Sequence, residues 1–395
     1  MLEKYKITSV TSEVGLDELR PVWEAMQWHP GADFEFFKLI LQSRKTIISP
    51  CILVASENGR PVALLAGRIE TAKLPVRFGY MALGKIPIRR LVVIEGGFMG
   101  VQTEELWQQF LAYSSGLLVE RQLNLAMLEQ IQIASPRHAA TEKKFGRMRL
   151  CLAHSAGEHW LMQLPGTWDE FLKCRSKKHR YWLKRLPAVL DKEFSGRWRI
   201  ENFTSEADAR RFINVAEQVA SLTYQRGLGV GFQLNAENLA RVEMEARRGQ
   251  LRGYVLFIDN KPKTFWYCFI YNRRLYLAAT GYDPAFRDYE VGTVLLMKIF
   301  QDHCGTDVGV VDFGLGDAGY KKRFGSEHYM ESSFYLFPKT ARGLGLNLLH
   351  SVMLFGTQMA KGMLNRLRVT QFLKTRWRRK LERPADKAGA AVEAA

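Results

Sequence analysis

The sequence predicts a mixed α/β protein of two tandem halves, each a mixed sheet flanked by helices, with basic helices at the C-terminus. Two patterns that occur twice along the 395 residues support this prediction. In each half a helix precedes two apolar runs around a polar turn, which is a hairpin signal. A strand, a turn, a helix and another strand then follow in the same order. A chain of this length can form two domains that each bury a core.

The first half begins with two helices and continues into a hairpin. The expected elements are, in order, helices 17–28 and 34–42, strands 51–55, 62–68 and 91–95, helix 104–121 and strand 126–130. Asn58 and Gly59 lie in the hairpin turn, and Gly96 and Gly97 should end the third strand. The following helix starts loosely, and no acidic motif follows the last strand. We therefore interpret this half as a degenerate copy of the second.

The second half contains the more distinctive motifs. Its expected elements are strand 159–164, basic helix 176–186, helix 236–248, strands 254–258, 264–270 and 275–280, helix 289–303, strand 308–313 and a short basic helix after Gly316. Pro187 should kink or restart the first helix. The boundary is expected near Gly157. The predicted domains are 1–157, 158–340, a pair of basic amphipathic helices in 341–383 and a disordered tail, 384–395.

Positive charge is concentrated in two segments of the chain. The formal net charge is +17. Residues 171–192 carry eight Lys or Arg against one acidic residue, and residues 341–395 carry eleven against three. Such clusters predict anionic partners: phosphates, a nucleotide-linked or glycan-linked substrate, tRNA, or an acidic membrane face.

Cysteine and histidine usage excludes several classes of function. The five cysteines are scattered without a CxxC pair, which predicts reduced thiols, and the histidines add no metal-ligand pattern. No histidine lies near an obvious nucleophile, which argues against a hydrolase triad. The first residues are polar and charged, so no signal peptide is expected. We expect a cytoplasmic protein without a metal, with peripheral contact at the inner membrane face as an option.

The C-terminal region supports more than one interpretation. Residues 344–364 are largely apolar but include polar residues and three glycines. They are consistent with a helix packed on the domain, with a helix on a membrane surface and, less well, with a membrane span. Residues 366–383 mix basic and apolar residues, a pattern typical of an interfacial helix at anionic lipid or of a nucleic-acid contact.

The segment from Leu275 to Gly325 has the layout of an active site. A strand leads through a tight turn into a helix, and the N-terminus of a helix offers free N–H groups to a phosphate or an acyl carbonyl. The next strand ends in the motif DFGLGDAGYKKRFG, which brings carboxylates close to a Tyr-Lys pair.

These motifs resemble those of a known family. They are GYDP at 281–284, Tyr289 with Gly292 at the helix start, the 312–325 motif and the basic SKKHRYWLKRL at 176–186. Together they resemble the acyltransferase domain of GNAT-like, FemAB-related proteins, including the cellulose-biosynthesis acetyltransferase group. The resemblance covers about residues 165–330 and extends only loosely to the first half. It implies two tandem acyl-CoA N-acyltransferase-like folds.

The resemblance also implies a donor site that binds acetyl-CoA or another acyl-CoA as co-substrate. The residues expected to contact this donor are Thr280, Arg287, Gly292 and Thr293. In the GNAT phosphate loop, Arg287 and Gly292 occupy family positions, whereas Glu290 stands where the family has its middle glycine. This carboxylate lies where a pyrophosphate would approach. It favours the FemAB-like alternative, in which the donor is aminoacyl-tRNA.

Four residues are expected to take part in catalysis. The resemblance implies that Tyr320 protonates the leaving group and that Lys321 binds the acceptor or the acyl carbonyl. Asp312 and Asp317 are candidates for a base or for orienting Lys321, and Asp317 is equally suited to a helix N-cap. Tyr320 and Lys321 also have ordinary interpretations, as a packing tyrosine and a surface lysine.

Five further residues are expected to contact substrate. They are Arg180, Lys184, Tyr282, Asp283 and Tyr289. A solvated helix face is the alternative for Arg180 and Lys184, and turn formation is the alternative for Asp283.

The function that follows from these expectations is transfer of an acyl group, acetyl in the first instance, to an amine or hydroxyl of an envelope or exopolysaccharide precursor. Two alternatives remain. One is aminoacyl transfer from tRNA. The other is a non-catalytic module that recruits polysaccharide assembly to the membrane.

Overall fold

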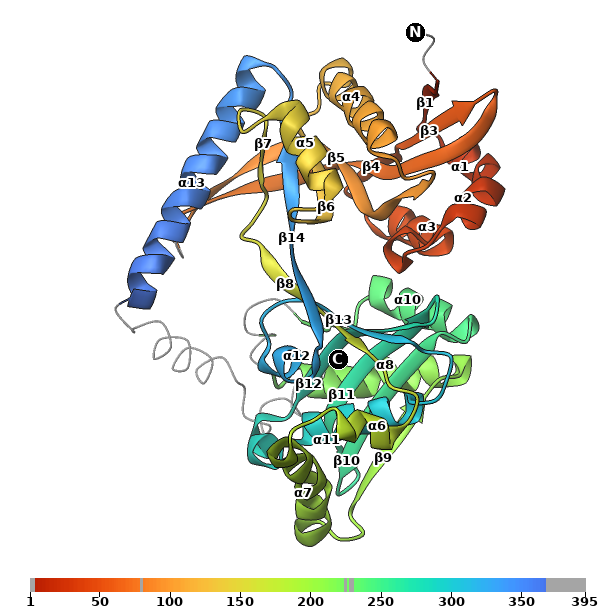
Figure 1. Ribbon diagram of the computed structural model, residues 1–395, viewed down its shortest axis with the longest axis vertical. Helices are drawn as coiled ribbons and strands as arrows, with labels where there is room; N and C mark the ends of the chain where they lie inside the picture. Colours follow the sequence, from red (N-terminus) through yellow and green to blue (C-terminus); the bar gives the residue numbers. More distant parts are fainter. Residues whose placement is uncertain (1–3, 79–80, 224–225, 227–230, 367–395) are drawn as a thin grey trace, which may run out of the picture. The chain divides into compact units, whose positions relative to one another are not determined.

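The computed structural model describes residues 4–78, 81–223, 226 and 231–366 (Figure 1). Contacts within the chain divide these residues into two compact units. The first contains residues 4–158 and 329–366, and the second contains residues 159–328. The sequence analysis had placed residues 329–340 in the second half, whereas the structure places them in the first unit. All five cysteines are free.

The sheet of the first unit is antiparallel except for one strand pair. Its strand order is β1 (Lys6–Val10), β3 (Ile52–Glu57), β4 (Arg60–Phe78), β5 (Met81–Gly100), β6 (Leu125–Gln132) and β14 (Glu327–Leu336). Only β5 and β6 are parallel, and α4 (Glu104–Glu120) connects them. Two short strands, β2 (Ile47–Pro50) and β7 (Leu150–Leu152), pair with β4 and β14. The other helices are α1 (Glu13–Glu18), α2 (Arg20–Met26), η1 (Pro30–Ala32), α3 (Phe34–Ser43), α5 (Pro136–Phe145) and α13 (Ala341–Arg366).

The sheet of the second unit repeats this arrangement. Its strand order is β9 (Trp198–Phe203), β10 (Leu251–Ile258), β11 (Lys261–Tyr271), β12 (Arg274–Tyr282), β13 (Val310–Leu315) and β8 (Gly157–Gln163). Again only one pair, β12 with β13, is parallel, and α11 (Val291–His303) connects it. The other helices are α6 (Trp168–Lys173), α7 (Lys177–Glu193), α8 (Glu206–Ala220), α10 (Ala236–Arg247), η2 (Pro284–Tyr289) and α12 (Gly319–Phe324). The predicted α/β fold of two tandem halves is confirmed.

The central strands of the second sheet are buried on both faces because apolar residues of β10 and β11 pack against helices on either side. Along β10, Tyr254 and Leu256 pack with α7 and α11, whereas Val255 and Phe257 pack with α8 and α10. This alternation follows from the two-residue period of a strand. The aromatic residues of β11 divide in the same way, with Trp266 on the side of α11 and Tyr267 on the side of α8.

Two local expectations were wrong. Gly96 and Gly97 do not end a strand, because β5 continues through them to Gly100 and pairs with β4 over most of its length. A Cβ atom at Gly97 would lie 2.7 Å from the carbonyl oxygen of Ala66, so the close neighbour explains this glycine. Helix α7 continues through Pro187 to Glu193. The burial of Leu183, Leu186 and Leu190 on one face accounts for this continuity.

The C-terminal residues form one helix in the described part of the chain. Helix α13 contacts β4 and β7 of the first unit, as expected for a helix packed on the domain. The basic segment predicted at 366–383 lies, after Arg366, outside the described residues, as does the tail 384–395. Within the described residues, no helix combines the length and apolar character needed to cross a membrane.

We expect Gly253→Ala to destabilise the second unit. Gly253 lies in β10, and a Cβ atom there would be 2.6 Å from the ring of Phe212 on α8. Overpacking of this kind costs about 1–3 kcal/mol. Thermal unfolding would measure the loss, with Gly309→Ala as control because a Cβ at Gly309 has no neighbour within 4 Å in the described structure. Equal melting temperatures for the two variants would contradict the packing argument.

Candidate active site

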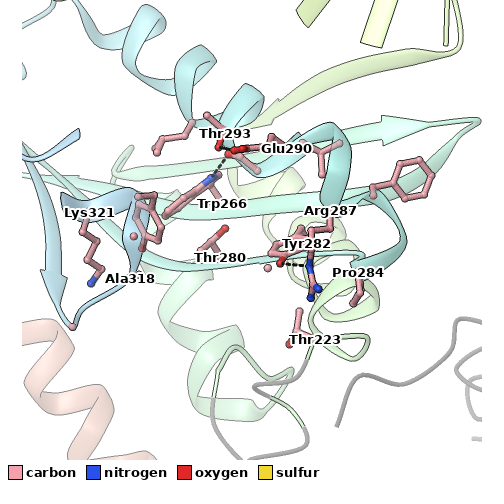
Figure 2. A pocket seen from close by; sticks show the side chains of 18 of the residues that line it. Thr223, Trp266, Thr280, Tyr282, Pro284, Arg287, Glu290, Thr293, Ala318 and Lys321 are labelled. Carbon is pink, nitrogen blue, oxygen red and sulfur yellow. Dashed lines mark hydrogen bonds between the residues drawn. The ribbon is translucent and has the colours of Figure 1, made fainter. Parts of the chain in front are cut away.

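A cavity lies in the second unit where two parallel strands separate. Strands β12 and β13 pair from Arg274 with Val310 to Tyr276 with Asp312. Beyond this register, the end of β12 and the loop after β13 form two walls of a cavity of about 760 Å³. It is lined by Thr223, Trp266, Thr280, Gly281, Tyr282, Pro284, Phe286, Arg287, Glu290, Val291, Gly292, Thr293, Leu296 and residues 315–321. In Figure 2, Lys321 and Ala318 are drawn on one side of Trp266 and Thr280, with Tyr282 and Arg287 on the other.

The turn after β12 is fixed by Asp283. Its carboxylate accepts a hydrogen bond from the backbone N–H of Ala285 at 3.0 Å and pairs with the Lys263 ammonium at 3.0 Å. The residue is 5% exposed and is the N-cap of η2. Asp283 thus forms the turn, the alternative from the sequence, and its contact with substrate stays a prediction. Tyr289 lies at the end of η2 and packs against Phe194, with ring centroids 5.1 Å apart.

The N-terminus of α11 faces the cavity but carries its own carboxylate. Glu290 adopts a left-handed conformation (φ 48°, ψ 38°), so the helix begins at Val291 after a sharp change in direction. The Glu290 carboxylate accepts a hydrogen bond from the Thr293 hydroxyl at 2.9 Å and pairs with Arg323 at 3.5 Å. The positive end of the helix dipole thus already has a negative partner. The indole N–H of Trp266 donates to the carbonyl oxygen of Gly292 at 3.2 Å.

Lys321 lies at one wall of the cavity with its ammonium group buried. The side chain is 7% exposed, and Nζ donates to the carbonyl oxygens of Gly314 at 3.1 Å and Leu315 at 2.8 Å. These carbonyls belong to a turn in which Gly314 and Gly316 have φ of 66° and 123°. Such angles favour glycine, so the turn chemistry of the motif fixes the lysine. The surface-lysine alternative does not fit this burial.

Tyr320 precedes Lys321 on α12 and also lines the cavity. Its ring packs edge-on against Trp266, with centroids 5.3 Å apart, and lies 6.3 Å from the ring of Phe313. Asp317 is exposed at the cavity wall. It is not a helix cap, because the N-cap of α12 is Ala318.

Asp312 is buried behind this turn and is absent from the lining of the cavity. Its carboxylate accepts hydrogen bonds from His159 Nε2 at 2.7 Å and from the backbone N–H of Gly314 at 2.8 Å, and it pairs with Arg274 at 3.3 Å. Burial alone would raise the pKa of Asp312, but His159, the Gly314 N–H and Arg274 together lower it below the ordinary value of 3.8. A carboxylate placed in this way cannot reach a substrate. Of its two expected roles, the orienting role fits, since it holds the turn that binds Lys321.

Helix α7 presents a row of exposed cations outside the cavity lining. Lys177, Lys178, Lys184 and Arg185 are exposed, and in the described structure none of them forms an ion pair. Arg180 is half-buried and donates to the carbonyl oxygen of Arg175 at 2.8 Å. The helix packs on α11 and η2, so these charges belong to the same unit as the cavity.

Eight of the thirteen residues predicted from the sequence line the cavity, and five do not. The eight are Thr280, Tyr282, Arg287, Gly292, Thr293, Asp317, Tyr320 and Lys321. The five are Arg180, Lys184, Asp283, Tyr289 and Asp312. The thirteen predicted residues do not include Trp266, His159 or Arg323. His159 lies 153 positions from Asp312, so no local pattern connects that pair.

The equivalent region of the first unit is packed. After the β5–β6 register, Phe98 and Trp107 pack in a tilted arrangement with ring centroids 5.4 Å apart, and the Arg137 guanidinium lies over Phe98. Helix α4 begins with a Thr103 cap and has Glu104 and Glu105 in its first turn. Two carboxylates at a helix N-terminus disfavour an anionic ligand. Across the described residues of both units, no group of three His, Cys, Asp or Glu could hold a metal ion.

The comparison with protein families identifies the domain that contains the cavity. Residues 177–322 match the family model described as an acetyltransferase (GNAT) domain. The chain contains a GNAT domain. It is therefore a GNAT-type acyltransferase, which confirms the resemblance at this level. The match includes α7, α11 and α12, and it ends just after Lys321.

Solved structures share the fold over most of the chain at low sequence identity. FemX is 10% identical with a TM-score of 0.54, over 84% of this chain and 97% of FemX. L-PGS from Bacillus licheniformis is 13% identical with a TM-score of 0.50, over 86% and 96% of the two chains. A conserved protein of unknown function from Bacteroides thetaiotaomicron VPI-5482 is 9% identical with a TM-score of 0.50, over 83% and 100%. A search of curated proteins found no significant match.

Asp312→Asn should lower the stability of the GNAT domain in a pH-dependent way. Removing one partner of a buried ion pair typically costs about 3–5 kcal/mol. The folded pKa of Asp312 is lowered, so its contribution is complete above the unfolded pKa of about 3.9 and is lost as pH falls through the folded value. Denaturant unfolding of both proteins should show a constant gap from neutral pH down to about pH 5 that narrows below pH 3.8. A gap independent of pH would contradict this assignment.

Proposed function

We propose that the GNAT domain transfers an acyl group from an acyl-CoA, acetyl-CoA in the first instance, to an amine or hydroxyl of an envelope or exopolysaccharide precursor. One observation carries the proposal. A single cavity brings together the end of β12, the N-terminus of α11 and the Tyr320–Lys321 pair. These are the three parts that acyl transfer needs: a surface for the donor, hydrogen-bond donors for its charge, and groups that act on the reacting atoms.

The donor would lie along the end of β12. Thr280 and Tyr282 flank Gly281 there, and the first N–H groups of α11, those of Val291 and Gly292, have no acceptor within the helix. A Cβ atom at Gly292 would meet only the Thr264 hydroxyl, at 3.6 Å. The fold itself therefore does not require glycine at this position, which is consistent with close approach of a ligand to the backbone. Arg287 adds a positive charge at this end of the cavity.

The residues at the α12 end of the cavity would each take one role in the reaction. The acceptor amine or hydroxyl attacks the acyl carbonyl carbon, the carbon–sulfur bond breaks, and the acceptor proton leaves to Asp317 or to water. The Lys321 ammonium stabilises the negative charge on the carbonyl oxygen in the transition state. The Tyr320 hydroxyl protonates the leaving thiolate and recovers its own proton from solvent. Asp312 and His159 contribute by holding the Gly314–Gly316 turn, not by contact with substrate.

A second donor, aminoacyl-tRNA, is favoured by Glu290. Its carboxylate already occupies the positive end of α11, so a pyrophosphate would meet a negative charge there. Helix α7 offers an alternative binding surface for a larger polyanion, with four exposed cations and the exposed ring of Tyr181. The chemistry in the cavity would be the same, except that the leaving group would be a ribose hydroxyl.

Lys321→Ala and Tyr320→Phe should each reduce acyl transfer, by about 100-fold or more, because one removes a charge at the reacting carbonyl and the other removes a proton donor. Transfer from radiolabelled acetyl-CoA to an amine-containing sugar would measure this loss. Lys322→Ala is the matched control, since its exposed side chain is adjacent on α12. Circular dichroism would verify folding, and Lys321→Met would keep the volume of the buried stem. Full activity in all variants would refute the assigned roles.

Glu290→Gln should strengthen the binding of acetyl-CoA. Removing one charge a few ångströms from the pyrophosphate is worth about 1 kcal/mol, or roughly fivefold in Kd. Calorimetric titration of both proteins would measure it, with an inert anionic nucleotide as control for the basic surface. If neither protein binds acetyl-CoA beyond that control, the acyl-CoA donor is excluded. Retention of charged tRNA by the purified protein, lost on charge reversal of Lys184 and Arg185, would then favour the second donor.

A further inference from the structure

Helix α13 is attached to the first unit through polar side chains. Asn347 is 4% exposed, and its amide donates to the carbonyl oxygens of Arg147 at 3.1 Å and Met148 at 2.7 Å. One turn later, a ring nitrogen of His350 lies 3.0 Å from the carbonyl oxygen of Leu152. Buried polar groups need partners of this kind. Asn347 and His350 are therefore directed toward the domain.

The outer face of the same helix is apolar. Leu348, Val352, Phe355 and Met359 follow one another at spacings of four, three and four residues, which places them in one stripe. Their exposures are 67%, 52%, 65% and 54%. Ordinary surface helices have the opposite arrangement, with apolar residues facing the core and polar residues facing water. We call these four residues the α13 stripe.

The helix cannot rotate to bury the stripe without losing its present contacts. Near its C-terminal half, a Cβ atom at Gly356 would lie 2.5 Å from the ring of Phe78 on β4, so the helix and strand are in close contact. The Thr357 hydroxyl donates to the carbonyl oxygen of Arg77 at 3.5 Å. Together with Asn347 and His350, these contacts fix the orientation of α13 over several turns. The stripe needs a cover from outside the unit.

Charge identifies the class of that cover. None of the 26 residues of α13 is acidic, and the sequence from 366 to 383 continues with eight Lys or Arg and one Glu. An apolar stripe that is directly followed by concentrated positive charge is complementary to a surface with an apolar interior and an anionic outer layer. The headgroup region of an anionic bilayer has this composition, whereas a protein partner would need an acidic apolar groove.

We propose that the α13 stripe docks the protein on an anionic membrane surface. Helix α13 lies in the plane of the interface, with Leu348, Val352, Phe355 and Met359 among the acyl chains, and the positive charge of the sequence that follows the helix adds attraction to anionic headgroups. No residue of α13 lines the cavity of the GNAT domain, so docking and acyl transfer are separable properties.

Flotation with lipid vesicles tests this proposal on the full chain. The wild-type protein should float with vesicles of phosphatidylcholine and phosphatidylglycerol and should float poorly with phosphatidylcholine alone. Val352→Ser/Phe355→Ser should weaken binding to the anionic vesicles by about tenfold or more, because two apolar side chains are lost from the interface. A matched control is Val14→Ser/Val119→Ser, which alters exposed valines of the same unit at 71% and 54% exposure. This control should bind like the wild type.

Charge and self-association are separated by further measurements. Arg378→Glu/Arg379→Glu should also weaken binding, and the remaining binding should depend less on salt. Binding of the stripe variant at wild-type strength, or no binding of the wild type to anionic vesicles, overturns the proposal. A concentration-dependent increase in mass by light scattering that the stripe variant abolishes, without vesicle binding, would assign the stripe to a second copy of the chain. Circular dichroism and thermal unfolding of the stripe variant would verify that the protein remains folded, whatever its acyl donor.

Discussion

The separation of β12 from β13 beyond Asp312 is the constraint on which the candidate site depends. Two parallel strands that stop pairing would leave backbone groups without partners, and the structure satisfies them with side chains. Asp312 accepts the Gly314 N–H where β13 bends, and Lys321 binds the carbonyls of Gly314 and Leu315. On the other wall, the Thr264 hydroxyl donates to the Gly281 carbonyl at 2.8 Å. The groups that keep the strands apart thus also place Lys321 at the cavity.

The same topology without these groups does not produce a site. In the first unit, β5 and β6 also pair in parallel over a short register, from Arg90 with Leu125 to Val93 with Leu128. Aromatic packing by Phe98 and Trp107 follows that register, and the first turn of α4 is acidic. A tandem fold therefore has two equivalent positions where a cavity can form. The volume and charge of the local side chains determine at which position a ligand could bind. This is a physical reason to assign the chemistry to the GNAT domain.

Local patterns were sufficient for most elements and for the cavity walls, but not for partners that are distant in the sequence. Local signals predicted strands 254–258 and 264–270, helix 236–248 and the short basic helix after Gly316, and the structure has β10, β11, α10 and α12 there. The pairing of β14 with β6 in the first sheet could not be predicted, because the sequence of a strand does not specify which other strand it pairs with. The contact between His159 and Asp312 was missed for the same reason. The strand end predicted at Gly96 and Gly97 was wrong, because the sequence does not distinguish a glycine required for close packing from one that ends a strand.

Glu290 adds a negative charge at the start of α11 in a backbone conformation that also suits glycine. Its left-handed backbone conformation is one that a glycine would adopt without strain, so the turn before α11 has a geometry that suits glycine. The side chain, however, brings a charge that Thr293 and Arg323 stabilise in place. A residue held by two partners is a built feature of the helix start and not a tolerated substitution. Under the proposed function, the negative charge of the donor would be met by other positive groups of the same unit, such as Arg287 at the cavity and the exposed cations of α7.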